Sequence, residues 1–187
     1  MNRMVGDLLD AYLIEAGNLE LRLQEVDARE IVREAYELFR HSLNIHELSI
    51  ELPDIEVPVQ CDPGRMSQVF NNLLSNAIKY SPGGGRVEIC LRLCGARQVL
   101  FEVADTGIGI SSNDLPYIFE PFRRAKFGGR DIPGMGLGLH VVRRIVEAHL
   151  GRIDVESSVG QGTTFKISLP RLTNHRQPHA ISKEHIA

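Results

Sequence analysis

The sequence predicts an α/β fold in which helices cover one face of a largely antiparallel β-sheet. Two patterns carry this prediction: several segments alternate apolar and polar residues, and longer segments repeat their apolar residues at helical spacing. The strand-like segments come as consecutive pairs with one apolar face each, which favours antiparallel neighbours under one layer of helices. A chain of 187 residues, 43% of them hydrophobic, is long enough for one domain with a substantial core.

The first third of the chain predicts two helices and two short strands. Within the first seventeen residues, one apolar stripe at helical spacing needs a partner helix; it consists of Val5, Leu8, Leu9, Tyr12, Leu13 and Ala16. A second helix, "AREIVREAYELFRHSL", follows Asp27, which forms a capping-box pattern with Glu30. The runs "LSIEL" and "EVPVQC" then predict two strands on either side of a Pro-Asp turn.

The middle of the chain predicts a long helix and a hairpin. Asp62 is the expected N-cap and Pro63 the first residue of a helix that runs to about Tyr80, where "SPGGG" ends it. The alternating runs "RVEICLRLC" and "QVLFEVAD" follow. We expect them to form a β-hairpin closed by "GAR".

The last third predicts a long loop, a helix and two strands. Residues 111–135 read as a functional loop with a short helix near 113–118 and a basic stretch containing Arg123, Arg124, Lys126 and Arg130. The run "LGLHVVRRIVEAHL" predicts an amphipathic helix, and "GRIDVESS" and "TTFKISLP" predict strands separated by "VGQG". From residue 172 the chain is polar and without periodicity, so we expect a disordered tail.

Charge and composition exclude several classes of function. A net charge of -3 without a long basic run gives no electrostatic basis for binding nucleic acid. Acidic residues interrupt the first helix, so it predicts neither a signal peptide nor a membrane span, and we expect a soluble, cytoplasmic chain without direct membrane contact. The odd number of cysteines predicts reduced thiols in the core; these are Cys61, Cys90 and Cys94.

The third predicted helix carries polar residues opposite its apolar arc. Asn72 and Asn76 lie one turn apart, with Lys79 beside them. Carboxamide oxygens are ligands for a hard cation, and an ammonium group can bind a phosphate. The alternative is an ordinary solvated helix face.

Two glycine clusters indicate close approach of the backbone to a ligand. In "FEVADTGIGI", Asp105 ends a strand above a glycine turn and can accept a hydrogen bond from an amine, while the glycines leave room for a flat ring. The order of residues does not fit the Rossmann fingerprint, in which the acidic residue follows the glycines. "GMGLGL" opens a helix whose amides favour a phosphate, unless it is only a hinge, and the basic loop could close over that phosphate.

These motifs occur in the order of a known family. From about Asp27 to Pro170 the chain resembles the ATP-binding catalytic domain of sensor histidine kinases, in the superfamily (GHKL) that includes DNA gyrase and MutL. "NLLSNAIKYS" resembles its asparagine box, "DTGIGI" and "GMGLGL" its two glycine boxes and "FEPF" its phenylalanine box, and "GQGTTF" follows them. Two departures are Leu150, where the family often has glycine, and Pro133, just before the second glycine box.

The resemblance implies a fold and a domain organisation. The expected fold is a two-layer α/β sandwich with a mixed, mostly antiparallel sheet and an ATP lid. Residues 1–22 resemble the end of a dimerisation helix hairpin and its linker, residues 23–170 the catalytic domain, and residues 171–187 the disordered tail. The implied partners are the dimerisation (phosphoacceptor) domain of a parent kinase, which is a homodimer and can be membrane-anchored, and the receiver domain of a response regulator.

The resemblance also implies ATP and Mg²⁺ as cofactors and a role for each matching residue. Asp105 would recognise the adenine amine with support from Thr163, Tyr80 would lie near the ribose, and Asn76 would hold the metal. Catalytic roles are implied for Asn72, Asn76, Lys79 and Arg124, the last two near the phosphates. Nucleotide contacts are implied for Asn72, Asn76, Lys79, Tyr80, Asp105, Gly107, Gly109, Ile110, Phe122, Arg124, Gly134, Gly136, Leu137, Gly138, Leu139 and Thr163.

The residue at position 72 bears on the reaction. Hydrolysing relatives in this superfamily carry a glutamate there, and an amide such as Asn72 cannot accept the proton of an attacking water. The family's nucleophile is a histidine on the dimerisation helix, followed by an acidic residue. The one such pair here is His46-Glu47, which we expect to lie in a loop, so the phosphoacceptor is expected outside this chain.

The other six histidines are assigned to helices of the nucleotide domain or to the tail; they are His41, His140, His149, His175, His179 and His185. Two alternatives share the motifs. One is a serine kinase of the anti-sigma type, and the other is a nucleotide-binding interaction module without phosphotransfer.

Overall fold

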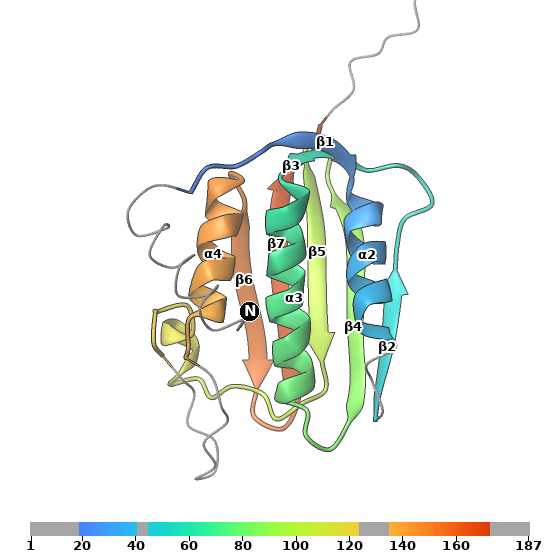
Figure 1. The fold of residues 1–187 in the computed structure, drawn as a ribbon. Coiled ribbons are helices and arrows are strands. Elements are labelled where there is room, and N and C mark those ends of the chain that lie inside the picture. Colours follow the sequence, from blue (N-terminus) through green and yellow to red (C-terminus); the bar gives the residue numbers. More distant parts are fainter. Residues whose placement is uncertain (1–18, 41–44, 124–134, 173–187) are drawn as a thin grey trace, which may run out of the picture.

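Five strands form one mixed sheet, and three helices lie across one of its faces (Figure 1). In this computed structural model, the described residues are 19–40, 45–123 and 135–172. The strand order is β2 (His46–Glu51), β4 (Gly85–Cys94), β5 (Gln98–Asp105), β7 (Gly162–Pro170) and β6 (Arg152–Ser158). Among these five strands, only β2 and β4 pair in parallel. The covering helices are α2 (Ala28–Arg40), α3 (Pro63–Lys79) and α4 (Gly138–Ala148), so the two-layer prediction is confirmed.

A second, two-stranded sheet was not predicted. It pairs β1 (Gln24–Asp27) with β3 (Pro58–Cys61) in antiparallel register. The two strands predicted around the Pro-Asp turn therefore exist, but β2 and β3 belong to different sheets. The short helix expected near 113–118 is a single 3₁₀ turn, η1 (Leu115–Tyr117).

Alternation along the strands separates an apolar face from a charged face. In β5 the buried residues Val99, Phe101 and Val103 point toward the helices, where the ring of Phe101 packs edge-on against Phe70 of α3 at 5.6 Å. The apolar arc predicted for α3 is thus buried against the sheet. One period-2 pattern per strand is sufficient to place all three helices on the same face.

The opposite face carries a chain of ion pairs that crosses all five strands. Arg92 of β4 lies 3.1 Å from Glu51 of β2 and 3.6 Å from Glu102 of β5. Lys166 of β7 continues the chain, 4.0 Å from Glu102 and 2.6 Å from Glu156 of β6. Exposed pairs of this kind contribute little free energy each, but they keep this face of the sheet polar.

The cysteines do not all lie in the core, as the sequence had suggested. Cys61 is fully buried in the core, and burial raises the pKa of its thiol to about 12. Cys90 is buried on the charged face instead, and Cys94 is exposed. β4 turns both residues toward the polar side of the sheet, so the prediction was wrong for the exposed Cys94, whereas Cys90 is buried as expected. All three thiols are free as expected.

Asp62 joins helices α3 and α4 to the segment that precedes β1. Its Oδ1 accepts from the backbone amide of Arg65, which confirms the predicted N-cap of α3, and its Oδ2 accepts from the amide of Arg22. The amide of Asp62 donates to Nε2 of His149, whose Nδ1 donates to the carbonyl of Ile145. Both bonds require a neutral His149 ring with its proton on Nδ1.

Helix α4 ends in a hydrogen-bond pattern that usually contains glycine. The amide of Leu150 donates to Glu147 O and the amide of Gly151 to Val146 O, both at 3.0 Å, which is the Schellman arrangement. This pattern requires a left-handed backbone at Leu150, which has a φ of 58°. The Leu150 side chain gains little from packing, because the residue is 85% exposed. The backbone strain arises because leucine, unlike glycine, has a Cβ atom that disfavours a positive φ.

The predicted N-terminal helix, the rest of the basic loop and most of the predicted tail fall on residues 1–18, 124–134 and 173–187, outside the described residues. The first two residues of the predicted tail belong to the fold, since Arg171 forms a bridge with Val59 and the amide of Leu172 donates to Pro58 O. Within the described ranges, no helix combines the length and the apolar character that are needed to cross a membrane.

We predict that Leu150→Gly stabilises the protein by about 1 kcal/mol. The substitution removes a left-handed conformation that is unfavourable for leucine by about 1–2 kcal/mol, and the flexibility of glycine in the unfolded chain offsets part of this gain. Urea unfolding measures the change. Leu38→Gly, at an exposed leucine inside α2, is the control and should destabilise by a similar amount. A loss of stability in Leu150→Gly would contradict the assignment.

Candidate nucleotide-binding site

The polar side of α3 is only partly exposed to solvent, although an ordinary solvated helix face was one of the two interpretations of its sequence. Asn72 is 7% exposed, and its Nδ2 donates to the carbonyl of Gln68. Asn76 is partly buried, one turn farther along. Lys79 extends over the ring of Tyr80, with Nζ 4.9 Å from the ring centre and 3.4 Å from the hydroxyl. The solvated-face alternative fails for Asn72 because α4 covers it.

The first turn of α4 meets Asn72. A Cβ atom at Gly138, the first residue of the helix, would lie 2.9 Å from Asn72 Oδ1, so only glycine leaves the carboxamide its space. Among the described residues, no side chain caps this helix, which leaves its first amides available to an anion. Leu137 is buried just before the helix, and Leu139 packs against the core. The predicted helix start is confirmed.

Asp105 ends β5 as predicted, with its side chain on the helix-covered face. Its Oδ1 accepts from the amide of Gly107 at 2.8 Å. Burial raises the pKa of this carboxyl above its usual range, while the amides of Gly107 and Thr163 partly offset the shift. A partly dehydrated carboxylate that is held by backbone amides is a strong acceptor for an amine.

The loop after Asp105 is held between α3 and the β6–β7 turn. The amide of Ile108 donates to Tyr80 O at 3.0 Å, and the amide of Gly160 donates to Ile108 O at 2.8 Å. Gly109 has a φ of 69°, and a side chain there would collide with the backbone of Ser158. The first glycine cluster is therefore packed against its neighbours, and it fixes the position of Asp105 relative to α3.

Three polar residues form one row across the end of the sheet. Asp105 pairs with Thr163 of β7, and Thr163 pairs with Ser157 of β6. The next row toward the core, Val103, Phe165 and Val155, is apolar. Thr163 was predicted for this site, whereas Ser157 was missed. The signal was available, because Ser157 is a polar residue in register with the apolar residues of its strand.

The basic loop is described only in part. Phe122 is 66% exposed, and its amide donates to the carbonyl of Gly136 at 3.0 Å. Arg123 pairs with Glu120 at 3.0 Å. Two predicted site residues, Arg124 and Gly134, lie outside the described residues. The structure thus brings the other predicted residues to one end of the sheet but does not place these two.

His46 is not a loop residue, which corrects the prediction. It is the first residue of β2, and its Nε2 donates to the carbonyl of Ser81 at 2.8 Å. His140 lies on α4 as expected, with Nδ1 donating to Phe119 O, and His149 lies at the C-terminal end of the same helix. These three rings are engaged with neighbouring backbone groups.

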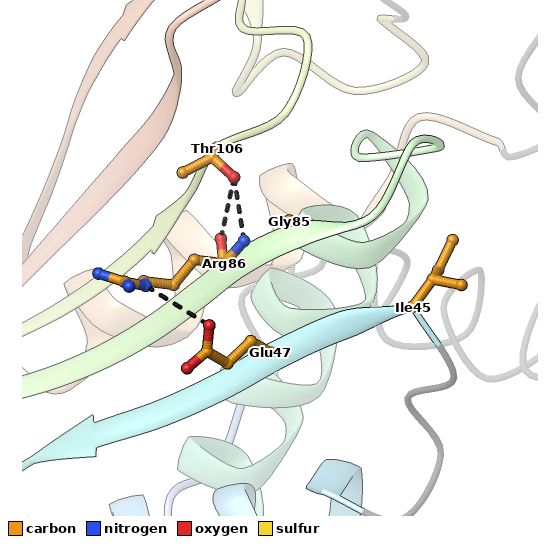
Figure 2. A pocket seen from close by; sticks show the side chains of 5 residues that line it. All are labelled: Ile45, Glu47, Gly85, Arg86 and Thr106. Carbon is orange, nitrogen blue, oxygen red and sulfur yellow. Dashed lines mark hydrogen bonds and ion pairs between the residues drawn. The ribbon is translucent and has the colours of Figure 1, made fainter.

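A separate hollow lies at the start of β2 and β4. Figure 2 shows it lined by Ile45, Glu47, Gly85, Arg86 and Thr106, with the Thr106 hydroxyl bonded to the backbone of Arg86. Arg86 and Glu47 lie 4.0 Å apart and are largely exposed. An open hollow with a solvated ion pair lacks the enclosed apolar surface that binds small ligands.

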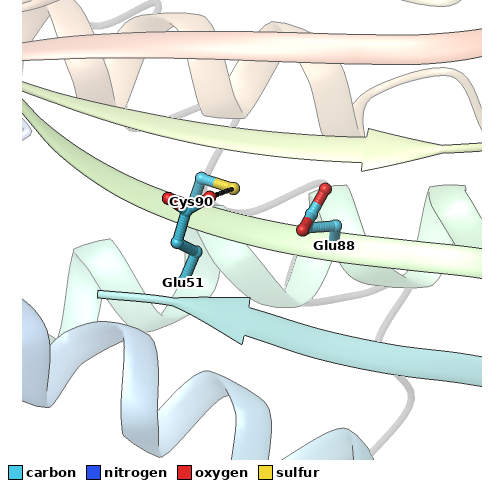
Figure 3. Close-up of side chains that lie close together, drawn as sticks. All are labelled: Glu51, Glu88 and Cys90. Carbon is cyan, nitrogen blue, oxygen red and sulfur yellow. Dashed lines mark hydrogen bonds between the residues drawn. The ribbon is translucent and has the colours of Figure 1, made fainter. Parts of the chain in front are cut away.

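The charged face also holds a group of potential metal ligands. Glu51, Glu88 and Cys90 present ligand atoms within 4.8 Å of one another (Figure 3). Burial, together with the bond to Glu51, raises the pKa of the Cys90 thiol to about 11, and Arg92 already pairs with Glu51. A protonated thiol beside a neutralised carboxylate is a poor metal site.

Comparison with known proteins agrees with this geometry. The sequence profile of the family of histidine kinase-, DNA gyrase B- and HSP90-like ATPases matches residues 61–173. The histidine protein kinase DivJ of Caulobacter vibrioides is 37% identical over 172 residues, which are 90% of this chain and 28% of DivJ. Sporulation kinase E of Bacillus subtilis is 33% identical, and the chain spans 22% of its length.

Solved structures agree as well. The mycobacterial sensor histidine kinase MprB matches with a TM-score of 0.71 and 30% identity, over 79% of this chain and 98% of that one. Full-length ShkA in complex with AMPPNP matches with a TM-score of 0.77 and 30% identity, over 91% of this chain and 36% of ShkA. The chain belongs to the family of histidine kinase-, DNA gyrase B- and HSP90-like ATPases and is an ATP-binding catalytic domain of the sensor histidine kinase type.

Proposed function

We propose that this domain transfers the γ-phosphate of ATP to a histidine on a dimerisation domain outside the chain, as part of a two-component sensor kinase. A ring nitrogen of that histidine forms the new bond to phosphorus while the bond from phosphorus to the departing ADP oxygen breaks. The observation that carries the proposal is the buried contact between Asn72 and the first turn of α4.

Asn72 supports transfer rather than hydrolysis. Its carboxamide lies beside the uncapped helix end, where phosphates are favoured, but an amide has no basic site that can take a proton from water. A general base is therefore missing at the position where hydrolysing relatives carry glutamate. The domain would hold ATP until a stronger nucleophile is supplied.

The two ends of the site support one orientation of ATP. Asp105 is suited to accept from the adenine amine, and Thr163 lies beside it in the same row. The first turn of α4, which begins at Gly138, is suited to the phosphates together with Gly136 just before it. Tyr80, the C-cap of α3, is bonded through its carbonyl to the loop after Asp105 and is the proposed neighbour of the ribose. In this proposal Lys79, Arg124 and Gly134 approach the phosphates, while Gly107, Gly109, Ile110, Phe122, Leu137 and Leu139 shape the pocket.

Asn76 is the proposed ligand of Mg²⁺, with assistance from Asn72. The donor chemistry fits, because carboxamide oxygens suit a hard cation, and the Asn76 side chain makes no hydrogen bond to other described residues. When bound, Mg²⁺ would neutralise charge on the β- and γ-phosphates. The carboxamides of Asn72 and Asn76 would orient those phosphates.

The domain organisation extends this proposal. Residues 1–22 would end the dimerisation hairpin and its linker, residues 23–170 form the catalytic domain, and residues 171–187 are a tail. The parent would be a homodimer whose phosphohistidine serves the receiver domain of a response regulator. We place the domain in the cytoplasm, whether or not the parent is anchored in a membrane.

We predict that Asn76→Ala removes most of the Mg²⁺-dependent part of ATP affinity, by about tenfold or more, without unfolding the domain. Calorimetric titration with ATP in magnesium and in EDTA measures this difference. Asn71→Ala, on the same helix but rotated away, is the matched control and should behave as the unmutated protein. An unchanged magnesium effect in Asn76→Ala would contradict the metal assignment.

We predict that Gly138→Ala weakens ATP binding while the free domain keeps its stability. The new Cβ displaces the Asn72 carboxamide, whereas alanine is the better helix former by about 0.5–1 kcal/mol. Thermal unfolding without nucleotide and titration with ATP separate the two effects. The control is Gly64→Ala, where the Cβ makes an ordinary contact of 3.4 Å in the first turn of α3. Equal affinity of both variants would count against the Asn72 contact.

We predict that the chain does not label itself with γ-phosphate but labels a dimerisation hairpin supplied from its own parent. His46, His140 and His149 are engaged by backbone groups, and in-line attack needs the nucleophile about 3 Å from phosphorus. Transfer should be slow, because no linker raises the local concentration of the two domains.

Labelled ATP followed by an acid wash decides between the alternatives. Acid-labile label on the hairpin alone is the expected result. Acid-stable label on a partner would indicate a serine kinase. If no protein is labelled, the chain is a nucleotide-binding module without phosphotransfer. Acid-labile label on this chain would indicate an internal phosphoacceptor.

A further inference from the structure

Ser157 stands apart from the residues to which the proposed function gives a role. It lies on β6, next to Thr163 and two strands from Asp105, in the single polar row that ends the apolar face of the sheet. Its side chain is partly buried, and it makes three hydrogen bonds to three different residues. A surface serine rarely has all of its bonding capacity engaged by protein groups.

The hydroxyl of Ser157 joins the glycine loop to the start of β7. It lies 2.7 Å from the carbonyl oxygen of Gly162, 2.8 Å from the amide nitrogen of Ile110 and 2.9 Å from the hydroxyl oxygen of Thr163. One oxygen atom therefore touches both segments that flank Asp105. The loop and the strand cannot shift independently while these bonds exist.

The direction of each bond follows from the available protons. A hydroxyl has one proton to donate, and a carbonyl can only accept, so Ser157 gives its proton to Gly162. The bond with Thr163 must then run the other way, with Thr163 donating to Ser157. The Thr163 oxygen then has only lone pairs left, so it can accept a hydrogen bond from a further partner but cannot donate one.

We infer that Ser157 is a positioning residue for base selection, because it turns Thr163 into a pure acceptor beside the acceptor Asp105. An exocyclic amine, as in adenine, has two protons to offer such a pair. A carbonyl at the same position, as in guanine, has none and would leave acceptors facing one another. Ser157 would thus contribute to the preference for ATP without touching the nucleotide.

This inference rests on the proposed function, because it assumes that the base binds at Asp105. It also differs from a purely structural role. If Ser157 only held the loop to the strand, its loss would weaken ATP and GTP alike. If it fixes the Thr163 hydroxyl, its loss lets that hydroxyl rotate and donate to a carbonyl, so the ratio of the two affinities changes.

The test compares the dissociation constants of ATP and GTP by calorimetry. The unmutated domain should prefer ATP by about five- to a hundredfold. Ser157→Ala should narrow this preference by about three- to tenfold, whereas Ser157→Thr, which keeps the hydroxyl, should preserve it. Ser168→Ala, on neighbouring β7 with its hydroxyl 3.4 Å from Arg152 O, is the matched control and should change nothing.

Thr163→Val tests the same step if Ser157→Ala folds poorly. This variant removes the hydroxyl that Ser157 acts through, so it should narrow the preference as well, and adding Ser157→Ala should narrow it no further. An unchanged ratio in both single variants, beside a clear ATP preference in the unmutated domain, would overturn the inference and leave the proposed function standing. Equal binding of ATP and GTP to the unmutated domain would overturn both.

Discussion

The contact between α3 and the first turn of α4, at Asn72 and Gly138, is the constraint on which the site depends. The buried Asn72 carboxamide lies against a helix start that has no side chain, and a Cβ atom at Gly138 would come within 2.9 Å of its Oδ1. In the proposed function the phosphates bind at this helix start, so their site depends on both residues. The packing of α3 on the sheet, including Phe70 against Phe101, holds this contact in place. The proposed binding of phosphate at this helix start therefore depends on how α3 and α4 pack against each other.

The two helices are also joined at their other ends. His149, at the C-terminal end of α4, accepts from the amide of Asp62 at the start of α3, and Asp62 also binds the backbone at Arg22. The segment that leads in from the N-terminus is therefore hydrogen-bonded to the helix that carries Asn72 and Asn76. A displacement of that segment has a direct physical route to the site, through a rigid helix of about 25 Å.

Most elements could be predicted from signals between residues that are near one another in the sequence, whereas pairing between distant segments could not. The Asp62-Pro63 cap, the β4–β5 hairpin and the glycine start of α4 were predicted because their signals lie within a few residues. The pairing of β1 with β3, the place of His46 in β2 and the burial of Asn72 depend on partners far along the chain. The alternation in β6 marked Ser157 as a polar residue on the apolar face, but its bonds to Ile110, Gly162 and Thr163 depend on the folding of the glycine loop and β7 around it.

Amide hydrogen exchange with and without ATP and magnesium tests the location of the nucleotide most directly. Our account predicts slower exchange at residues 107–110, in the first turn of α4 and at the start of β7, with little change in β1 and β3. Slower exchange confined to the hollow at Ile45, Arg86 and Thr106, or no change near Asp105 and Gly138, would contradict it.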